Sequence, residues 1–264
     1  MEAGLKMFAH NGWFGKIMAL VFVWLFLALQ AIQAQTEEPK YAQYLVSYLG
    51  IPILDTYQEI SKDANFTTVV YINQIKPFWA TFQNVRNRYS ATFTSVGFTP
   101  IRDEKEILEG NFTQSLSGQY SEEMNKVIYS NRQKSPWNKR AYSVLSAVHF
   151  LEQESRNLKY PHTMDIVIEG EIWEAYVTHK GAETLEIIDE SVNTKHVNIV
   201  MRPRGGQMIL SRTDILMDFL STAGSRLDLW ITDNQQIVRV QVGEFPKAVV
   251  LELVKNGVNA METD

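Results

Sequence analysis

Residues 226–253 read RLDLWITDNQQIVRVQVGEFPKAVVLEL, and apolar and polar side chains largely alternate along them. This alternation indicates β-strands that bury one face. Turn residues separate three such runs, at Asp233-Asn234 and at Gly243 with Pro246. The apolar positions of the three predicted strands are Leu227, Leu229 and Ile231, then Val238, Val240 and Val242, and then Val249, Leu251 and Leu253.

The same pattern recurs upstream, and further turns are predicted at Lys180-Gly181 and at residues 203–206, PRGG. A strand and its turn take roughly 8–12 residues, which is typical of an antiparallel meander that closes into a barrel or half-barrel. No alternation of strands and helices is visible, so a parallel nucleotide-binding sheet is not expected. The upstream apolar positions are Trp173, Ala175 and Val177, and Val197, Ile199 and Met201.

Two segments have a helical period instead. Residues 141–156 place Ala141, Val144, Ala147, Val148 and Leu151 on one face. Residues 211–221 form a second candidate helix, with Ser211 three residues before Asp214 in a capping-box pattern. We therefore predict a mainly β protein: a strongly curved antiparallel sheet, as a half-barrel or open barrel, with two short packing helices.

The first 34 residues differ from the rest. An apolar run of 13 residues, Ile17–Leu29, comes after the basic residues Lys6 and Lys16. A small residue, Ala34, lies shortly after the run. This order is typical of a secretory signal peptide cleaved near Ala34, and the run is short for a membrane span. An uncleaved amino-terminal anchor is the alternative. Residues 35–264 are then expected to form a single β-rich domain, with a mobile loop or hairpin tip at 120–140.

Composition excludes several classes of function. The chain of 264 residues has no cysteine and a formal net charge of -5. Thiol chemistry, thiolate metal sites and a lipid anchor on cysteine are therefore excluded. The acidic balance gives no support to nucleic-acid binding.

Motifs for catalysis or cofactors are lacking. The sequence has no Gly-x-Ser-x-Gly elbow and no phosphate-binding fingerprint, so Gly205-Gly206 is interpreted as a turn. His149, His162, His179 and His196 lack the spacing of a zinc hydrolase, although His179 and His196 could meet across strands. We predict no enzyme activity, no cofactor and no metal, while two acids distant in sequence could still converge as in a glycoside hydrolase.

Basic residues gather in one segment. They are Lys126, Arg132, Lys134, Lys139 and Arg140. A solvated loop explains them most simply. The functional interpretation is peripheral contact with anionic head groups or another acidic envelope component.

Aromatic residues are the most informative class for ligand binding. A curved sheet can hold a hydrophobic ligand on its concave side beneath helices, although aromatic residues also pack well in cores. The candidate ligand-binding residues are Phe78, Trp79, Phe82, Trp173, Tyr176 and Trp230.

Several local motifs occur together in a familiar order. They are VSYLGIP at 46–52, FQNVRNRY at 82–89, ILEG at 107–110, VLSAVHFL at 144–151, LWITDN at 229–234 and a final strand at 248–253. This order resembles the exported bacterial family named domain of unknown function 3108, over about residues 41–255. The chain departs from the family at the end of the helix motif, where an Arg is common at the position of Leu151 or Glu152, and at Asn234, where an Asp is common.

The resemblance implies a periplasmic protein with a curved half-barrel similar to that of periplasmic lipoprotein carriers, and no catalytic residues. The leading hypothesis is therefore an exported protein that binds an apolar or amphiphilic envelope ligand, such as a lipid or lipoprotein, on the concave face. A structural or interaction module of the envelope without a small ligand is the alternative. A hydrolase of envelope glycans or lipids is the third hypothesis.

Overall fold

The computed structural model describes residues 37–206, 209–210, 213–244 and 248–257. Contacts divide the chain into two units, residues 1–38 and Pro39–Asp264. The predicted signal peptide at 1–34 and its cleavage point near Ala34 lie outside the described residues. In the described part of the chain, no helix has the length and apolar character needed to cross a membrane.

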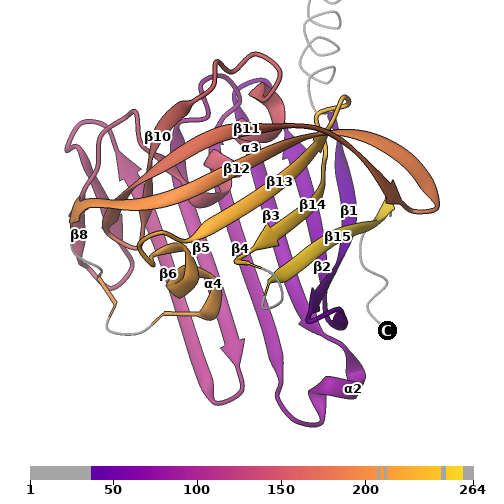
Figure 1. Cartoon of the computed structure of the whole chain (residues 1–264). Coiled ribbons are helices and arrows are strands. Elements are labelled where there is room, and N and C mark those ends of the chain that lie inside the picture. The colour runs from indigo at the N-terminus through magenta and orange to yellow at the C-terminus, as the bar shows by residue number, and fades with distance from the viewer. Residues whose placement is uncertain (1–36, 207–208, 211–212, 245–247, 258–264) are drawn as a thin grey trace, which may run out of the picture. The chain divides into compact units, whose positions relative to one another are not determined.

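One sheet of fifteen strands contains every strand of the described ranges (Figure 1). Its strands are β1 (Glu37–Tyr48), β2 (Ile51–Lys62), β3 (Phe66–Ile75), β4 (Val85–Thr94), β5 (Pro100–Glu109), β6 (Phe112–Ser121), β7 (Lys126–Tyr129), β8 (Lys134–Pro136), β9 (Tyr142–Ser143), β10 (His162–Ile168), β11 (Glu171–Ile187), β12 (Glu190–Gly206), β13 (Arg226–Thr232), β14 (Ile237–Val242) and β15 (Val249–Asn256). The helices are α2 (Pro77–Ala80), α3 (Val144–Glu154) and α4 (Ile215–Leu220).

Nearly every strand pairs with the strand that follows it along the chain. The exception joins the two halves of the sheet, where β1 pairs antiparallel with β15 and Val46 faces Leu251. The edges of the sheet are β8 and β9, and β9 pairs in parallel with β10. The sheet is therefore open between β8 and β9 rather than closed.

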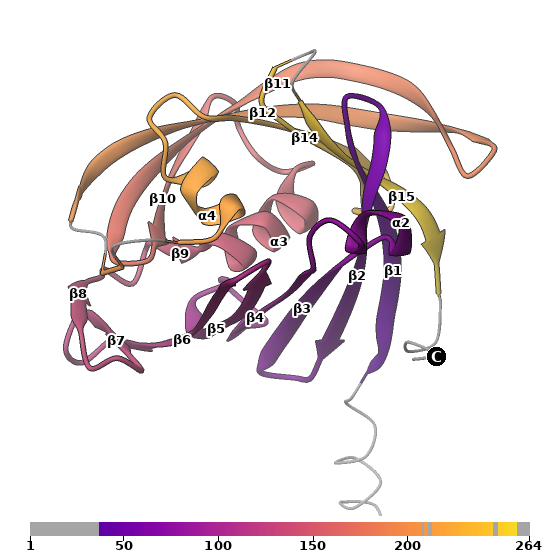
Figure 2. The ribbon, with the colours of Figure 1, turned by 90° about the horizontal axis from the view of Figure 1, so that it is seen from below.

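The sheet bends so that α3 and α4 lie between its two halves (Figure 2). This confirms the predicted mainly β class with a curved sheet, although the described residues contain three short helices instead of two. Alternation explains why the inner face is apolar: Val177, Val197 and Leu229 are fully or almost fully buried there. They form one core with Ala147 and Leu151 of α3.

Local capping defines where the two packed helices begin. Ser143 starts α3 with a capping box, in which its side chain and that of Ser146 accept from each other's backbone amides. Asp214 starts α4 by accepting from the amides of Leu216 and Met217. The prediction that Asp214 supports a cap at Ser211 was therefore wrong, because Asp214 is the capping residue; Ser211 lies outside the described residues.

Two predicted turns lie inside long strands. Lys180-Gly181 belongs to β11, where the register against β12 shifts between His179 and Gly181, and residues 203–206 belong to β12. A bulge of this kind bends a strand without ending it, and Gly181 has a φ of 136°, which other residues rarely adopt. The segment 120–140, predicted as a mobile loop or hairpin tip, contributes the short strands β7 and β8.

The turn between β11 and β12 offers a test of the register. Ile188 and Asp189 both have positive φ, 53° and 61°, as a two-residue hairpin requires. A β-branched residue is strained there, and Ile188 is exposed. We expect Ile188→Asn to raise the free energy of unfolding by about 1 kcal/mol, measured by chemical denaturation.

Ile188→Val is the matched control, because it keeps the branched Cβ and should leave stability unchanged. An Asn variant that is no more stable than the Val variant would contradict the assigned turn.

Candidate functional site

A cavity lies between the inner face of the sheet and the two packed helices. We call it the apolar cavity; its volume is about 160 Å³ and its lining is almost wholly apolar. An engineered cavity of about this size in another protein, lined by similar side chains, stays dry and binds benzene. The helices supply Leu145, Val148, Leu151, Leu216 and Leu220, and the sheet supplies among others Ile166, Ile168, Ile199, Met201, Val240 and Val242.

A few polar side chains border this cavity, and each has a partner. Thr56 donates to the side-chain oxygen of Asn73 at 2.9 Å, and the hydroxyl of Tyr71 accepts from Gln58 at 2.6 Å. Burial raises the pKa of Tyr71, so its hydroxyl stays protonated. The border is therefore polar but uncharged on the side of β2 and β3.

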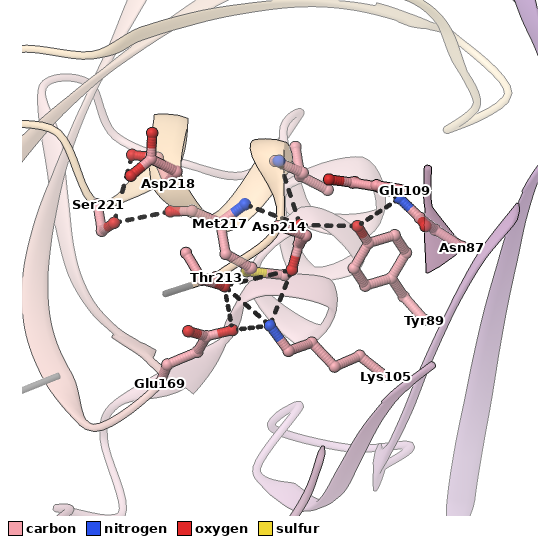
Figure 3. A network of polar contacts seen from close by, with 11 residues as sticks. Asn87, Tyr89, Lys105, Glu109, Glu169, Thr213, Asp214, Met217, Asp218 and Ser221 are labelled. Carbon is pink, nitrogen blue, oxygen red and sulfur yellow. Dashed lines mark hydrogen bonds and ion pairs between the residues drawn. The ribbon is translucent and has the colours of Figure 1, made fainter. Parts of the chain in front are cut away.

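A buried ion network lies beside the apolar cavity. The ammonium group of Lys105, on β5, contacts Glu169, which follows β10, and Asp214 at 2.8 Å (Figure 3). It also donates to Thr213 at 2.9 Å. Tyr89 of β4 donates to the other oxygen of Asp214 at 2.8 Å. The network thus joins β4 and β5 to the loops before β11 and α4.

The network is deeply buried and its charges do not balance. The side chains of Lys105, Glu169 and Asp214 are exposed by 7%, 6% and 0%. Burial raises the pKa of Glu169, although Lys105 opposes the rise. One positive charge thus faces two carboxyl groups, and removal of Lys105 would leave both without an opposite charge.

A second, smaller cavity adjoins the network, and we call it the polar cavity. It has a volume of about 70 Å³, and Lys105, Glu169, Asp103, Tyr120 and Tyr129 are among its lining residues. Within the described residues, Oε2 of Glu169 and Oδ1 of Asp103 are buried and have no hydrogen-bond partner. In Figure 3 one oxygen of Glu169 is turned away from Lys105. Two carboxyl groups therefore present unpaired acceptors at one small cavity.

The Asp103 carboxyl has an unusual protonation behaviour. Burial raises the pKa of Asp103 to about 6, even though hydrogen bonding from Tyr120 favours the charged form. The Ser143 hydroxyl lies near Asp103 and also lowers the pKa of Asp103. The hydrogen bond that this hydroxyl donates, however, goes to the side chain of Ser146. A carboxyl of this pKa suits proton transfer near neutral pH. The cavity is too small for a sugar ring, however, so binding of a small polar group fits the geometry better.

Phe78, Trp79 and Phe82, the first three predicted aromatic residues, line neither cavity. Phe78 and Trp79 belong to α2, Phe82 follows it, and their rings pack on one another. Phe78 and Phe82 are exposed, and Trp79 donates to the carbonyl of Pro52. The helical turn after Pro77 carries these rings on the β3–β4 connection, which explains why they do not reach the inner face.

The other three aromatic residues divide between the faces of the sheet. Trp173 is buried in the core that surrounds the apolar cavity, without lining the cavity. Tyr176 points the other way and contacts Arg202. Trp230 packs in a separate core cluster and stacks on His196. Strand alternation explains these positions, and none of the six predicted residues lines either cavity.

The predicted basic residues are all exposed, and two of them line a third cleft. Lys139 and Arg140 line a cleft of about 540 Å³ together with His162 and Arg204. Arg204 also forms ion pairs with Asp165 and Glu174. The remaining three residues, Lys126, Arg132 and Lys134, lie on or between β7 and β8 at the sheet edge.

The histidines have structural partners. His196 contacts Glu183 and Asp228, each at 2.7 Å, and His149 contacts Glu152 at 3.0 Å. His179 faces Val197 rather than His196, because of the bulge before Gly181. In the described ranges, no group of three or more histidine, aspartate or glutamate side chains is arranged to hold a metal ion.

Sequence reasoning missed Lys105, Glu169 and Asp103 as site residues. One signal was present, since Asp103, Lys105 and Ile107 share the inner face of β5, and a lysine on an apolar face requires a buried partner. The partners lie 64 and 109 residues away along the chain, beyond the reach of any local pattern.

The pKa of Asp103 predicts a pH dependence of stability. The unfolded carboxyl titrates near 3.8 and the native one near 6, so the native state binds the proton more tightly between these values. Stability should therefore fall as the pH rises through this window. Relative to Asp103→Asn, we expect the wild type to lose about 3 kcal/mol in free energy of unfolding between about pH 3 and pH 7, measured by chemical denaturation.

The matched control is Asp189→Asn, at an exposed turn, which should follow the wild type at every pH. A constant difference between wild type and Asp103→Asn would show that Asp103 titrates normally.

Comparison with known proteins yields a likeness of fold. No protein-family model matches the chain, and no curated protein matches it. A crystal structure from Brucella abortus, described as a beta-barrel-like protein of domain of unknown function DUF1849, is similar with a TM-score of 0.55 and 10% sequence identity. The match covers 84% of this chain and 98% of that one. The chain is therefore similar in fold to a β-barrel-like domain of unknown function.

Proposed function

We propose that this protein is an exported, non-enzymatic periplasmic protein that binds an apolar or amphiphilic envelope molecule. The apolar cavity of about 160 Å³ carries this proposal. The helices α3 and α4 cover the inner face of the sheet, yet they leave this space between Leu151, Leu220 and Val240. A concave, mostly apolar site with a few polar groups at its border is what small-molecule sites share.

Apolar burial would supply the affinity. Each methylene group removed from water contributes about 0.8 kcal/mol. The bordering residues Thr56, Tyr71 and Asn73 already satisfy one another or their neighbours, so an apolar chain can enter without breaking their hydrogen bonds. An acyl or alkyl chain therefore fits the lining better than a polar molecule does.

Export and family membership are parts of the same proposal. The basic, apolar and small-residue order of residues 1–34 supports export with cleavage near Ala34. The order of motifs between residues 46 and 253 supports membership of the family of domain of unknown function 3108. The β-barrel-like likeness is compatible with it at the level of fold.

Filling the apolar cavity should weaken ligand binding. Val240 of β14 lines the cavity and is only half-buried, so Val240→Phe would place a ring in the space and keep a good strand residue. We expect the uncharged fluorescent probe N-phenyl-1-naphthylamine to bind the wild type, and Val240→Phe to weaken its binding by about tenfold or more in a fluorescence titration.

Val254→Phe is the matched control, because Val254 is exposed on β15 and does not line the cavity. It should bind the probe like the wild type. The proposal is overturned if the wild type binds neither this probe nor any natural lipid that mass spectrometry can detect after purification.

A second candidate function rests on the cleft at Lys139 and Arg140. We propose that these residues, with Lys126, Arg132 and Lys134, give the protein peripheral contact with anionic envelope components. The cleft of about 540 Å³ supports this idea because Lys139 and Arg140, both exposed, line it together, whereas the charge of Arg204 in the same lining is balanced by Asp165 and Glu174.

Charge reversal tests this second candidate. Lys139→Glu with Arg140→Glu should reduce co-sedimentation with vesicles of anionic phospholipid to the level seen with zwitterionic vesicles, because the attraction is electrostatic. The control, Lys62→Glu with Lys180→Glu, makes the same change of charge at exposed sites outside the cleft. Equal losses in both double variants would reject a role for the cleft.

A further inference from the structure

We propose that the polar cavity holds the head group of the bound amphiphile, and that this head is a cationic hydrogen-bond donor such as a primary ammonium group. The inference rests on the proposed function, because it requires that the tail occupies the apolar cavity.

The two cavities are neighbours. Tyr89, Val144, Leu145 and Ile168 line both of them. A molecule whose tail lies against Leu151 and Ile199 therefore has its other end within reach of Lys105 and Glu169. The second cavity adds the charged side chains of Asp103, Lys105 and Glu169 to a lining that is otherwise largely apolar. This change matches a molecule with one apolar end and one polar end.

The polar cavity offers acceptors. Oε2 of Glu169 belongs to a side chain that is 94% buried, and within the described ranges it has no hydrogen-bond partner. Oδ1 of Asp103, on the same cavity, is likewise unpaired there. A buried carboxylate oxygen without a donor costs free energy, and a ligand that donates to it recovers that cost.

Three donors beside the cavity are already used. An ammonium group has three hydrogens, and Lys105 donates to Glu169, Thr213 and Asp214. Tyr89 donates to Asp214, and Tyr120 donates to Asp103. An anionic head would therefore find no free donor on these three residues, whereas a donor head finds two free acceptors.

The balance of charge favours the same head. Lys105 supplies one positive charge, and Glu169, Asp214 and Asp103 are the carboxyl groups of the cluster. A cation that enters would reduce the excess of negative charge in a region of low dielectric. A volume of about 70 Å³ accommodates a single ammonium group. The described residues offer no three-residue ligand set for a metal ion, which favours the ammonium group.

Three probes with the same tail and different heads test the inference at neutral pH. Decylamine, decanol and decanoate are used to displace N-phenyl-1-naphthylamine from the wild-type protein, below their micellar concentrations. We expect decylamine to displace the dye at about a tenfold lower concentration than decanoate, with decanol between them.

Two variants locate the preference. Glu169→Gln removes the charge of the carboxylate but keeps an acceptor for Lys105. Asp103→Asn likewise removes a charge, outside the Lys105 network, and keeps an acceptor for Tyr120. Each should reduce the advantage of decylamine over decanoate to about threefold or less and leave decanol unchanged. The control is Glu106→Gln, an exposed carboxylate on β5, which should keep the full preference. Circular dichroism confirms that each variant is folded.

The outcomes separate this inference from the proposed function. Equal displacement by the three probes, tighter binding of decanoate, or a preference that survives both variants overturns the ammonium assignment and leaves the apolar site standing. No displacement by any probe overturns both. The expected order, lost in Glu169→Gln and Asp103→Asn and kept in Glu106→Gln, supports the inference.

Discussion

A buried ammonium group is the constraint on which the inner face of this sheet depends. Lys105 points inward from β5, and its charge is tolerated only because Glu169 and Asp214 approach it from the other half of the sheet. Breaking a buried ion pair by removing one partner typically costs about 3–5 kcal/mol. Because Asp214 also caps α4, the same interaction sets where that helix begins and how it lies against Tyr89.

The two cavities follow from this arrangement. Helices α3 and α4 supply apolar side chains to the inner face, but the ion network holds the start of α4 toward β4 and β5. The space near Val240 and Leu220 is left as the apolar cavity. The space between the network and Tyr129 is left as the polar cavity, with its unpaired carboxylate oxygens. The ion pairs of Lys105 therefore fix the position of α4, and that position leaves both cavities unfilled.

Local patterns predicted the fold better than the site. Alternation located β13, β14 and β15, and the apolar face of 141–156 located α3, because both periods arise from neighbouring residues. The predicted face of β14 was wrong at Val238, which packs in a different core cluster from Val240 and Val242 because the register against β13 shifts there. The same reasoning read Gly181 and residues 203–206 as turns, since a glycine in a bulge and a glycine in a turn look alike in sequence. The site depends on contacts such as Lys105 to Asp214, which only the bend of the sheet brings together. The aromatic residues were informative about strands and core, whereas the cavity lining is mostly aliphatic.

The pairing of β1 with β15 has a consequence for the order of folding. All other strand neighbours are consecutive along the chain, and most are joined by short loops, although α3 lies between β9 and β10 and α4 between β12 and β13. Val46 and Leu251, by contrast, are separated by most of the chain. Leu251 also lines the apolar cavity. The apolar cavity is thus completed by the contact with the largest entropic cost of closure, so two half-sheets can form early without enclosing it. Formation of the cavity would then report that the last strand is in place.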